Sequence, residues 1–237
     1  LKEAIYATDI VFIAVGTPSE SNGQADLSQI IEVTEQIAAH INKYKVIVVK
    51  STVPVGTVEL VLNILSRTKK EGNEFDIVSN PEFLREGNGL HDFFNPDRIV
   101  VGVSADQALK TMRALYNPLI RPSNRPLSHS SIKKVPVVET DIRSAQMIKY
   151  ASNAFLATKI TYINEIGNLC EKTGVNVEDV SLGVGLDKRI GSRFLRVGPA
   201  YGGSCFPKDT KALTITGDLF KTDLSIIKAV IKSNEKR

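Results

Sequence analysis

The stretch DIVFIAV at residues 9–15 is a short apolar run rich in β-branched residues, and it ends at the turn Gly16-Thr17-Pro18. A run of this kind bounded by turn residues predicts a buried strand. Similar runs follow at residues 45–52, 75–80 and 98–103. Helical patterns separate these runs, and the alternation predicts an α/β fold with a parallel sheet covered by helices on both faces.

Apolar residues at helical spacing predict helices over residues 26–42, 54–67 and 105–116. Asp26 is placed to cap the first of these helices, and Pro54 opens the second. In sheets of this class, ligands bind beyond the carboxyl ends of the strands, where the strand order reverses. The loops that follow the strands are therefore expected on the functional edge: GTP at 16–18, STVP at 51–54 and NPEF at 80–83.

The pattern changes after residue 138. One long helical pattern runs over residues 141–173, and shorter helices are expected at 177–182, at 207–215 and from 224 to the end. We therefore expect a sheet-containing domain over residues 1–139 and an all-helical domain over residues 140–237. The first residues look like the tail of a helix and the last helix has no capping signal, so both ends look cut.

Composition is that of an ordinary soluble protein, with 42% hydrophobic and 24% charged residues. No stretch approaches the roughly 20 apolar residues of a membrane span, and the start does not resemble a signal peptide, so a cytoplasmic location is expected. The net charge of +4 comes from Lys and Arg interleaved with acidic residues, which argues against nucleic acid as a partner. Two cysteines are too few for a disulfide framework.

The segment YGGSCFPKD at residues 201–209 is the sharpest chemical feature. Ser204 can act as an N-cap and Pro207 fits the first turn of a helix, which puts Cys205 at a helix N-terminus. Unpaired amides and the helix dipole favour a thiolate there, with Lys208 nearby and Asp209 coming round to the same face. The alternative is a buried small cysteine in a glycine-rich turn. Cys170 lies in the apolar register of the long helix and is expected to be a core thiol.

Lys149 and Asn153 are one helical turn apart on the long helix. An ammonium and a carboxamide at this spacing can hold an oxyanion or a water, although a solvated helix face has the same pattern. Glu82 and Glu86 follow a strand end, where either is a candidate general base or a solvated loop residue. The pair at residues 51–52 is a candidate helix cap.

Two familiar kinds of site have no pattern in this sequence. His40, His91 and His129 stand apart from cysteines and paired carboxylates, so no metal site is expected. No Gly-x-Gly-x-x-Gly follows a strand, so the fingerprint that binds a dinucleotide pyrophosphate is absent from these residues.

Taken in order, several segments resemble the UDP-glucose/GDP-mannose dehydrogenase family, and together they span nearly the whole chain. The segments are FIAVGTP, KSTVPVGT, SNPEFLREG, NPDRIVVG, IKYASNAFLATKITYINE, KRIGSRFL and GGSCFPKD. The resemblance implies a partial Rossmann-like domain that binds NAD, then a central helical domain that forms a homodimer through the helix at 141–173. It implies two successive NAD-dependent oxidations of a sugar C6 alcohol to a carboxylate.

The resemblance also implies roles for individual residues. Cys205 matches the thiol that forms a thiohemiacetal and then a thioester, which water hydrolyses. Lys149 and Asn153 match residues that stabilise the oxyanion and hold the water, and Asp209 matches a residue associated with acid-base work. Thr52 and Glu82 match a pair linked to proton transfer through water.

Binding contacts are implied in the same way. The implied sugar-nucleotide contacts are Glu82, Phe83, Leu84, Glu86, Lys149, Asn153, Arg189, Arg196, Tyr201 and Gly202. The implied NAD contacts are Val15, Thr17, Pro18, Ser51, Thr52, Glu86 and Lys208.

The implied substrate is UDP-glucose, since residues 83–84 and 202–206 look more like that branch than the GDP-mannose branch. UDP-galactose and UDP-N-acetylhexosamine are harder to separate. Family members begin with a strand and the glycine fingerprint and end with a second Rossmann-like domain, and neither is within these residues. The competing functions are a noncatalytic dimerising remnant and a Cys-dependent acyl transferase that has no need of NAD.

Overall fold

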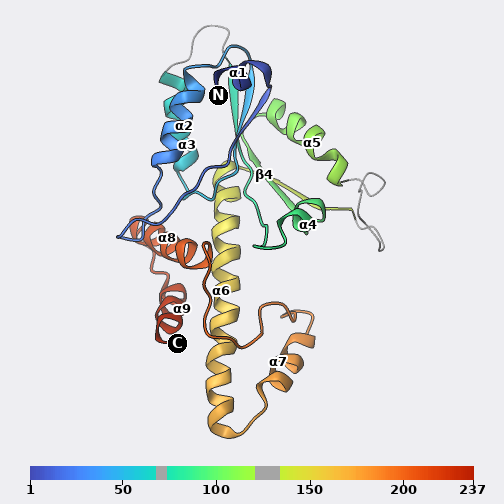
Figure 1. The fold of residues 1–237 in the computed structure, drawn as a ribbon, viewed down its shortest axis with the longest axis vertical. Coiled ribbons are helices and arrows are strands. Elements are labelled where there is room, and N and C mark those ends of the chain that lie inside the picture. Colours follow the sequence, from blue (N-terminus) through green and yellow to red (C-terminus); the bar gives the residue numbers. More distant parts are fainter. Residues whose placement is uncertain (68–73, 121–133) are drawn as a thin grey trace. The chain divides into compact units, whose positions relative to one another are not determined.

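The computed structural model describes residues 1–67, 74–120 and 134–237, and these residues form two compact units. The first unit consists of Leu1–Thr17 and Asp26–Lys149. The second unit consists of Pro18–Ala25 and Tyr150–Arg237. Figure 1 shows the ribbon with its helices and strands labelled.

A five-stranded sheet forms the base of the first unit, and its strands lie side by side in chain order. The strands are β1 (Ile10–Ile13), β2 (Lys45–Val49), β3 (Phe75–Ser79), β4 (Ile99–Val103) and β5 (Val137–Thr140). β1, β2 and β3 are parallel to one another, and β4 is parallel to β5. β3 and β4 are antiparallel.

The antiparallel step corrects the expectation of a wholly parallel sheet. Between β3 and β4 the chain forms only α4 (Gly89–Phe94), which has six residues. After this link the chain enters β4 in the direction opposite to β3. The described sheet also has no reversal of strand order, and β5 is a strand that the sequence patterns did not predict.

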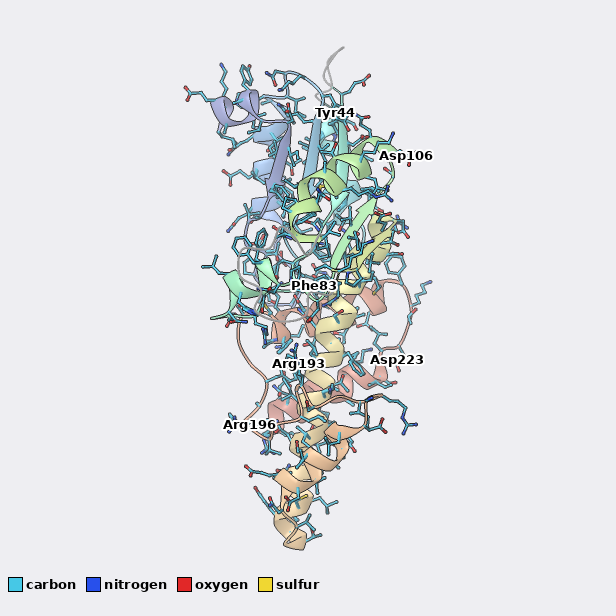
Figure 2. All side chains as sticks on the ribbon, turned by 90° about the vertical axis from the view of Figure 1, so that its right-hand side faces the viewer. Tyr44, Phe83, Asp106, Arg193, Arg196 and Asp223 are labelled. Atoms are coloured by element: carbon cyan, nitrogen blue, oxygen red, sulfur yellow. The ribbon has the colours of Figure 1, made fainter. Side chains whose placement is uncertain are left out.

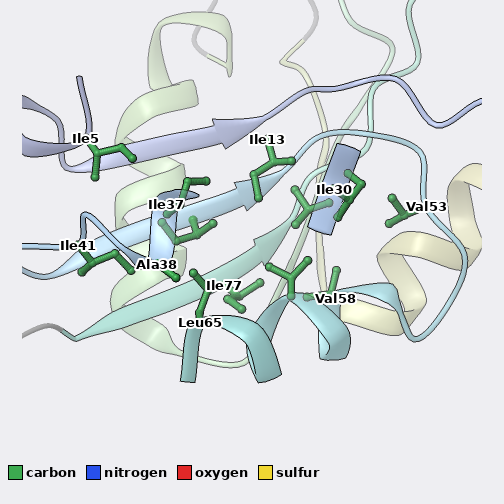
Figure 3. Close-up of a cluster of buried hydrophobic side chains, with 13 residues drawn as sticks. Ile5, Ile13, Ile30, Ile37, Ala38, Ile41, Val53, Val58, Leu65 and Ile77 are labelled. Atoms are coloured by element: carbon green, nitrogen blue, oxygen red, sulfur yellow. The ribbon is translucent and has the colours of Figure 1, made fainter. Parts of the chain in front are cut away.

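Helices cover both faces of the sheet, as predicted. On one face α1 (Lys2–Ala7), α2 (Ser28–Ala38) and α3 (Thr57–Arg67) pack on a cluster of isoleucine, valine and leucine side chains (Figure 3). On the other face α5 (Asp106–Ile120) packs on β2, β3 and β4. Every residue of β2 is buried, with Ile47 and Val49 facing the first cluster and Val46 and Val48 facing the second. This alternation explains why β2 is an unbroken apolar run.

The long helix α6 (Ile142–Thr173) begins and ends at recognisable caps. The Asp141 carboxylate accepts hydrogen bonds from the Ser144 backbone N–H at 2.9 Å and from its hydroxyl. At the other end Gly174 has a φ of 72°, and the Val175 N–H donates to the Cys170 carbonyl at 3.0 Å. These are an N-cap and a Schellman-type C-cap. Both ends of the helix predicted at 141–173 are thus locally encoded.

The second unit is helical apart from its loops. After α6 come α7 (Val177–Leu186), α8 (Phe206–Leu219) and α9 (Ser225–Lys236). Tyr150 and Ala154 of α6 pack with Ala212 and Leu213 of α8. Residues 18–25 belong to this unit as well, and the Cβ position of Gly23 lies 3.3 Å from the Ile215 side chain. No described helix is both long and apolar enough to cross a membrane.

Helices α2 and α3 begin a few residues later than the sequence predicted. α3 begins at Thr57 rather than at Pro54, because Gly56 has a φ of 102°. α2 begins at Ser28, and Asp26 accepts a hydrogen bond from the Ser28 N–H at 2.8 Å although Leu27 is the N-cap.

The contact at Gly102 of β4 generates a stability prediction. A Cβ there would lie 2.5 Å from the Ala145 Cβ and 2.7 Å from the Asp141 carbonyl oxygen. We expect Gly102→Ala to lower the free energy of unfolding by about 2 kcal/mol, because the start of α6 must shift to admit a methyl group. Urea denaturation followed by circular dichroism measures this loss. Gly89→Ala is the matched control, since its Cβ position meets nothing within 4 Å; equal losses in both variants would contradict the prediction.

Candidate functional site

The loops after β1 and β2 meet at the carboxyl edge of the parallel strands, as their positions in the sequence predicted. The Thr17 hydroxyl donates to the Thr52 carbonyl at 2.8 Å, and the Ser51 hydroxyl donates to the Val15 carbonyl at 2.7 Å. These two bonds tie the loops to each other. The Ser51 hydroxyl therefore joins two loops. It does not cap the helix that follows, so the alternative in which residues 51–52 form a helix cap is wrong for Ser51.

Glu82 and Lys149 form an ion pair within the first unit. The Lys149 ammonium donates to Glu82 Oε1 at 3.1 Å, and the Leu84 N–H donates to Glu82 Oε2 at 2.6 Å. Lys149 is only 4% exposed, so it does not lie on a solvated helix face. Both carboxylate oxygens of Glu82 have donors, which fixes the direction in which this group faces.

Phe83, the next residue, has a cation on its ring. The Arg98 guanidinium carbon lies 3.7 Å from the ring centroid, and Lys149 Nζ lies 5.3 Å from it. Figure 2 shows where Phe83 lies in the first unit. Such contacts stabilise both ring and cation, and they hold the segment that carries Glu82. Leu84 and Glu86, in contrast, are exposed.

Hydrogen bonds within residues 85–92 hold the remainder of this segment. The Asp92 carboxylate accepts hydrogen bonds from the Arg85 N–H and guanidinium and from the Asn88 carboxamide. The hydrogen bonds from the Arg85 side chain hold the pKa of Asp92 well below its usual value, and burial opposes that shift. Arg85 and Asp92 thereby close the loop that contains Glu86.

In the second unit, Asp209 is a fully buried carboxylate. The Asn153 carboxamide donates to its Oδ2 at 2.6 Å, and the Lys208 ammonium donates to its Oδ1 at 2.7 Å. Asn153 is itself only 6% exposed, which excludes the solvated helix face for this residue too. A buried charge with partners on both oxygens is a costly arrangement that a folded chain retains only when the geometry is good.

Cys205 is the N-cap of α8, so the thiol lies at a helix start as predicted. The prediction that Ser204 caps this helix is wrong, because Ser204 lies one residue before the N-cap. Its hydroxyl lies 3.6 Å from Cys205 Sγ. The helix begins at Phe206 because Pro207 in the first turn has no N–H that needs a partner. Gly203 has a φ of 78°, a conformation that favours glycine. The thiol is partly exposed, so a buried cysteine in a turn does not describe it.

Side chains from two helices hold the loop that leads to Cys205. The Asn234 carboxamide of α9 accepts from the Tyr201 N–H at 2.8 Å and donates to the Tyr201 carbonyl at 3.1 Å. The Asn164 carboxamide of α6 accepts from the Gly198 N–H at 2.9 Å. The Tyr201 and Phe206 rings then meet edge to face. Sequence reasoning missed Asn164 and Asn234, because a lone asparagine in a helix has no local pattern that indicates its distant partner.

The other predicted site residues have simpler surroundings. Arg189 is exposed and pairs with Asp187, and Arg196 lies in the exposed loop between α7 and α8 (Figure 2). Gly202 is exposed, whereas Tyr201 is buried. Cys170 is buried, in agreement with a core thiol.

The described residues fit part of a dinucleotide site. The loops after β1 and β2 present short side chains at the strand ends, and a Cβ at Gly16 would meet only Gln29 Oε1 at 3.7 Å. The glycine fingerprint for a pyrophosphate does not occur after any strand of this sequence. Among described residues no cluster of three His, Cys, Asp or Glu side chains could hold a metal ion. His129 lies outside the described residues.

Comparisons with known proteins match this chain along almost its whole length. Residues 1–120 match the NAD binding domain of the UDP-glucose/GDP-mannose dehydrogenase family, and residues 143–236 match the central domain of that family. The chain is 47% identical over 236 residues to UDP-glucose 6-dehydrogenase YwqF of Bacillus subtilis (strain 168), covering 100% of this chain and 50% of the relative. It therefore spans about half the length of such relatives.

Two solved structures have the same fold. A UDP-glucose dehydrogenase from the archaeon Pyrobaculum islandicum is 41% identical with a TM-score of 0.89, covering 99% of this chain and 52% of that one. A ternary complex of GDP-mannose dehydrogenase from Pseudomonas aeruginosa is 32% identical with a TM-score of 0.72, with the same coverage.

The Asp92 network generates a prediction with a defined pH dependence. Because the folded-state pKa of Asp92 is depressed, its contribution to stability is present above the unfolded pKa of about 3.9 and is lost as pH falls below it. We expect Asp92→Asn to lower the thermal unfolding midpoint by about 3 °C at pH 7. That difference from wild type should shrink between about pH 5 and pH 2.

Differential scanning calorimetry across this pH range measures the difference. Asp223→Asn is the control, since Asp223 makes only an exposed pair with Lys228 and should show no such pH-dependent gap. A difference for Asp92→Asn that stays constant with pH would contradict the prediction.

Proposed function

The chain belongs to the UDP-glucose/GDP-mannose dehydrogenase family, and on this premise we propose that the protein oxidises the C6 alcohol of UDP-glucose to a carboxylate with NAD. The observation that carries the proposal is Cys205, a partly exposed thiol at the start of α8. UDP-glucose is favoured over GDP-mannose because similarity to the UDP-glucose relatives is higher. A substrate screen that includes UDP-galactose and UDP-N-acetylhexosamine tests the alternative substrates. We propose residues 1–139 and 140–237 as the functional domains.

We propose that Cys205 forms the covalent bond to the sugar. In the first oxidation, C6 loses a hydride and its hydroxyl a proton, which leaves an aldehyde. Addition of the Cys205 thiol to that aldehyde gives a thiohemiacetal, and loss of a second hydride and a proton gives a thioester. Water then attacks the thioester, which releases the carboxylate and returns the thiol. Each hydride passes to one NAD⁺, the chemistry that the cofactor supplies when bound.

The remaining residues are proposed to handle protons and the oxyanion. The Lys149 ammonium and the Asn153 carboxamide are donors that suit a developing oxyanion. Asp209, held by Asn153 and Lys208, is a carboxylate suited to orient the hydrolytic water. Glu82 and Thr52 are proposed to pass the alcohol proton through water.

Binding contacts remain proposals at the residues that match the family. For the sugar nucleotide these are Glu82, Phe83, Leu84, Glu86, Lys149, Asn153, Arg189, Arg196, Tyr201 and Gly202. For NAD they are Val15, Thr17, Pro18, Ser51, Thr52, Glu86 and Lys208. We also propose a cytoplasmic location, because the mechanism needs Cys205 as a free thiol and such thiols persist in reducing compartments.

A homodimer through α6 is a further part of the proposal. Three large apolar side chains, each seven residues from the next, are exposed along this helix: Phe155 at 64%, Tyr162 at 51% and Leu169 at 57%. Residues at this spacing form a stripe on one helix face. Exposed apolar stripes of this kind mark interfaces more often than solvated surfaces.

Replacement of the thiol tests the reaction. In the intact protein we expect Cys205→Ser to abolish turnover of UDP-glucose to the carboxylate, with NADH formation limited to the first oxidation, while sugar-nucleotide binding persists, because a protonated serine hydroxyl adds poorly to the aldehyde. Absorbance at the NADH band and calorimetric binding measure the two properties. Cys170→Ala is the matched control and should retain turnover, since Cys170 is a core thiol. Full NADH yield from Cys205→Ser would end the covalent mechanism, and a wild-type protein that binds NAD without turnover would favour the scaffold function.

A charge in the apolar stripe tests the dimer. We expect Phe155→Glu to shift the protein from dimer to monomer in sedimentation-velocity runs at micromolar concentration, because a carboxylate would be buried without a partner at the interface. Leu219→Glu on α8, where the parent residue is 72% exposed, is the control that should leave the dimer intact. An unchanged sedimentation coefficient for Phe155→Glu would reject α6 as the interface.

A further inference from the structure

Lys50 is a cation at the carboxyl edge of the sheet, two residues before Thr52. It directly follows β2, and its backbone N–H donates to the Ile13 carbonyl at 2.9 Å. Its ammonium extends to the end of the next strand, where it donates to the Asn80 carbonyl at 3.2 Å and to Asn80 Oδ1 at 3.3 Å. Lys50 thus links the ends of β2 and β3 through its side chain.

Asn80, its partner, is 1% exposed and uses every polar atom that it has. Its backbone N–H donates to the Val49 carbonyl at 2.9 Å, and its carboxamide N–H donates to the Val100 carbonyl at 2.7 Å. Its Oδ1 also accepts from the Tyr116 hydroxyl. Asn80 is therefore fixed from β2, β4 and α5 together, and the ammonium of Lys50 binds to a rigid acceptor.

The bond between Lys50 and Asn80 has a specific relation to the proposed proton-transfer pair. Thr52 follows Lys50 by two residues, and Glu82 follows Asn80 by two residues. The Thr52 carbonyl is held by Thr17, and Glu82 is held by Lys149. The Lys50 side chain adds a link to the backbone hydrogen bond that joins the two strand ends, so it helps to fix the spacing from which each segment extends.

A neutral donor would satisfy the two oxygens of Asn80 at lower cost. Lys50 is partly buried, and withdrawal of an ammonium from water is unfavourable unless charge partners compensate. The positive charge of Lys50 is attracted by the Glu82 carboxylate and repelled by the Lys149 ammonium. The positive charge of Lys50 therefore has an electrostatic effect at the site that a glutamine or methionine would lack.

We propose that Lys50 is a positioning residue for the proposed oxidation: its ammonium, bonded to Asn80, holds the segments that carry Thr52 and Glu82 and adds positive charge beside the Glu82 carboxylate. This inference rests on the proposed function. It assigns Lys50 no contact with substrate or cofactor.

Three titratable groups surround the Lys50 ammonium. Burial lowers the pKa of Lys50 to about 8, the charge of Glu82 opposes that shift, and the charge of Lys149 adds to it. Tyr116 shares the Asn80 acceptor, and burial raises its pKa to about 12, so it stays neutral where Lys50 titrates. Lys50 is charged below about pH 8, and we expect the rate of oxidation to lose the Lys50 contribution as pH rises through that value.

Steady-state kinetics of the intact protein test the proposal. We expect Lys50→Met to lower kcat by about 10- to 100-fold with a smaller change in KM, because Thr52 and Glu82 lose their spacing while the other proposed binding contacts remain. The pH profile of kcat/KM should lose a limb near pH 8. Lys50→Arg, which stays charged, should restore most of kcat and move that limb beyond pH 10.

Lys45→Met is the matched control. Lys45 is the first residue of β2, at the end of the strand opposite to Lys50; it is buried and donates to the Thr8 carbonyl at 2.6 Å. It should lose thermal stability and keep kcat and the shape of the pH profile. A Lys50→Met variant that behaves like Lys45→Met, or that turns over like wild type, would overturn the positioning role.

A measurement independent of turnover separates this proposal from the proposed function. Lysine side-chain carbon NMR, with the Lys50 signal assigned from the Lys50→Arg spectrum, follows the Lys50 pKa directly. Glu82→Gln should lower that pKa further, and Lys149→Met should raise it. A wild-type protein that forms no NADH from any sugar nucleotide would reject the proposed function alone. A Lys50 pKa that changes in neither variant would reject the electrostatic coupling of Lys50 to Glu82 and Lys149.

Discussion

Burial of β2 on both faces constrains the arrangement of the first unit. All five of its residues are inside the protein, and the four that follow Lys45 divide their side chains between two apolar clusters. The middle of a strand in this position has no room for a charged or hydrogen-bonding side chain, because each would need a partner in the core. Polar groups therefore gather at the strand ends. Lys45 bonds to a carbonyl at one end, and Lys50 and Ser51 bond to carbonyls at the other.

The same reasoning explains why polar groups gather at one edge of the sheet. The parallel direction of β1, β2 and β3 brings three strand ends together, and a loop follows each of them. Those loops satisfy one another through side-chain bonds, such as that of Thr17 to Thr52. Beyond this edge the Glu82 carboxylate accepts a hydrogen bond from the Lys149 ammonium at 3.1 Å. The proposed proton transfer and oxyanion stabilisation both require positioning of this kind.

In the second unit, α8 has an equivalent role. Its N-cap carries the thiol of Cys205, and its first turn carries Lys208 and Asp209. Because Asp209 is fully buried, its carboxylate depends on Asn153 and Lys208 for both oxygens. Removal of Lys208 would leave the buried charge uncompensated, and removal of Asn153 would leave Oδ2 without a donor, so the packing of α8 on α6 and the proposed role of Asp209 depend on the same contacts.

Local sequence patterns predicted the long helix α6, the thiol of Cys205 at a helix start, and strands β1 to β4 but not β5. Apolar periodicity and local caps carry this information, since they depend on neighbours a few residues away. The antiparallel direction of β4, the burial of Lys149 and Asn153, and the partners of Asn80, Asn164 and Asn234 are visible in the folded structure alone. These features depend on residues distant in sequence, whose approach follows from how the core packs, and local patterns carry no record of that packing.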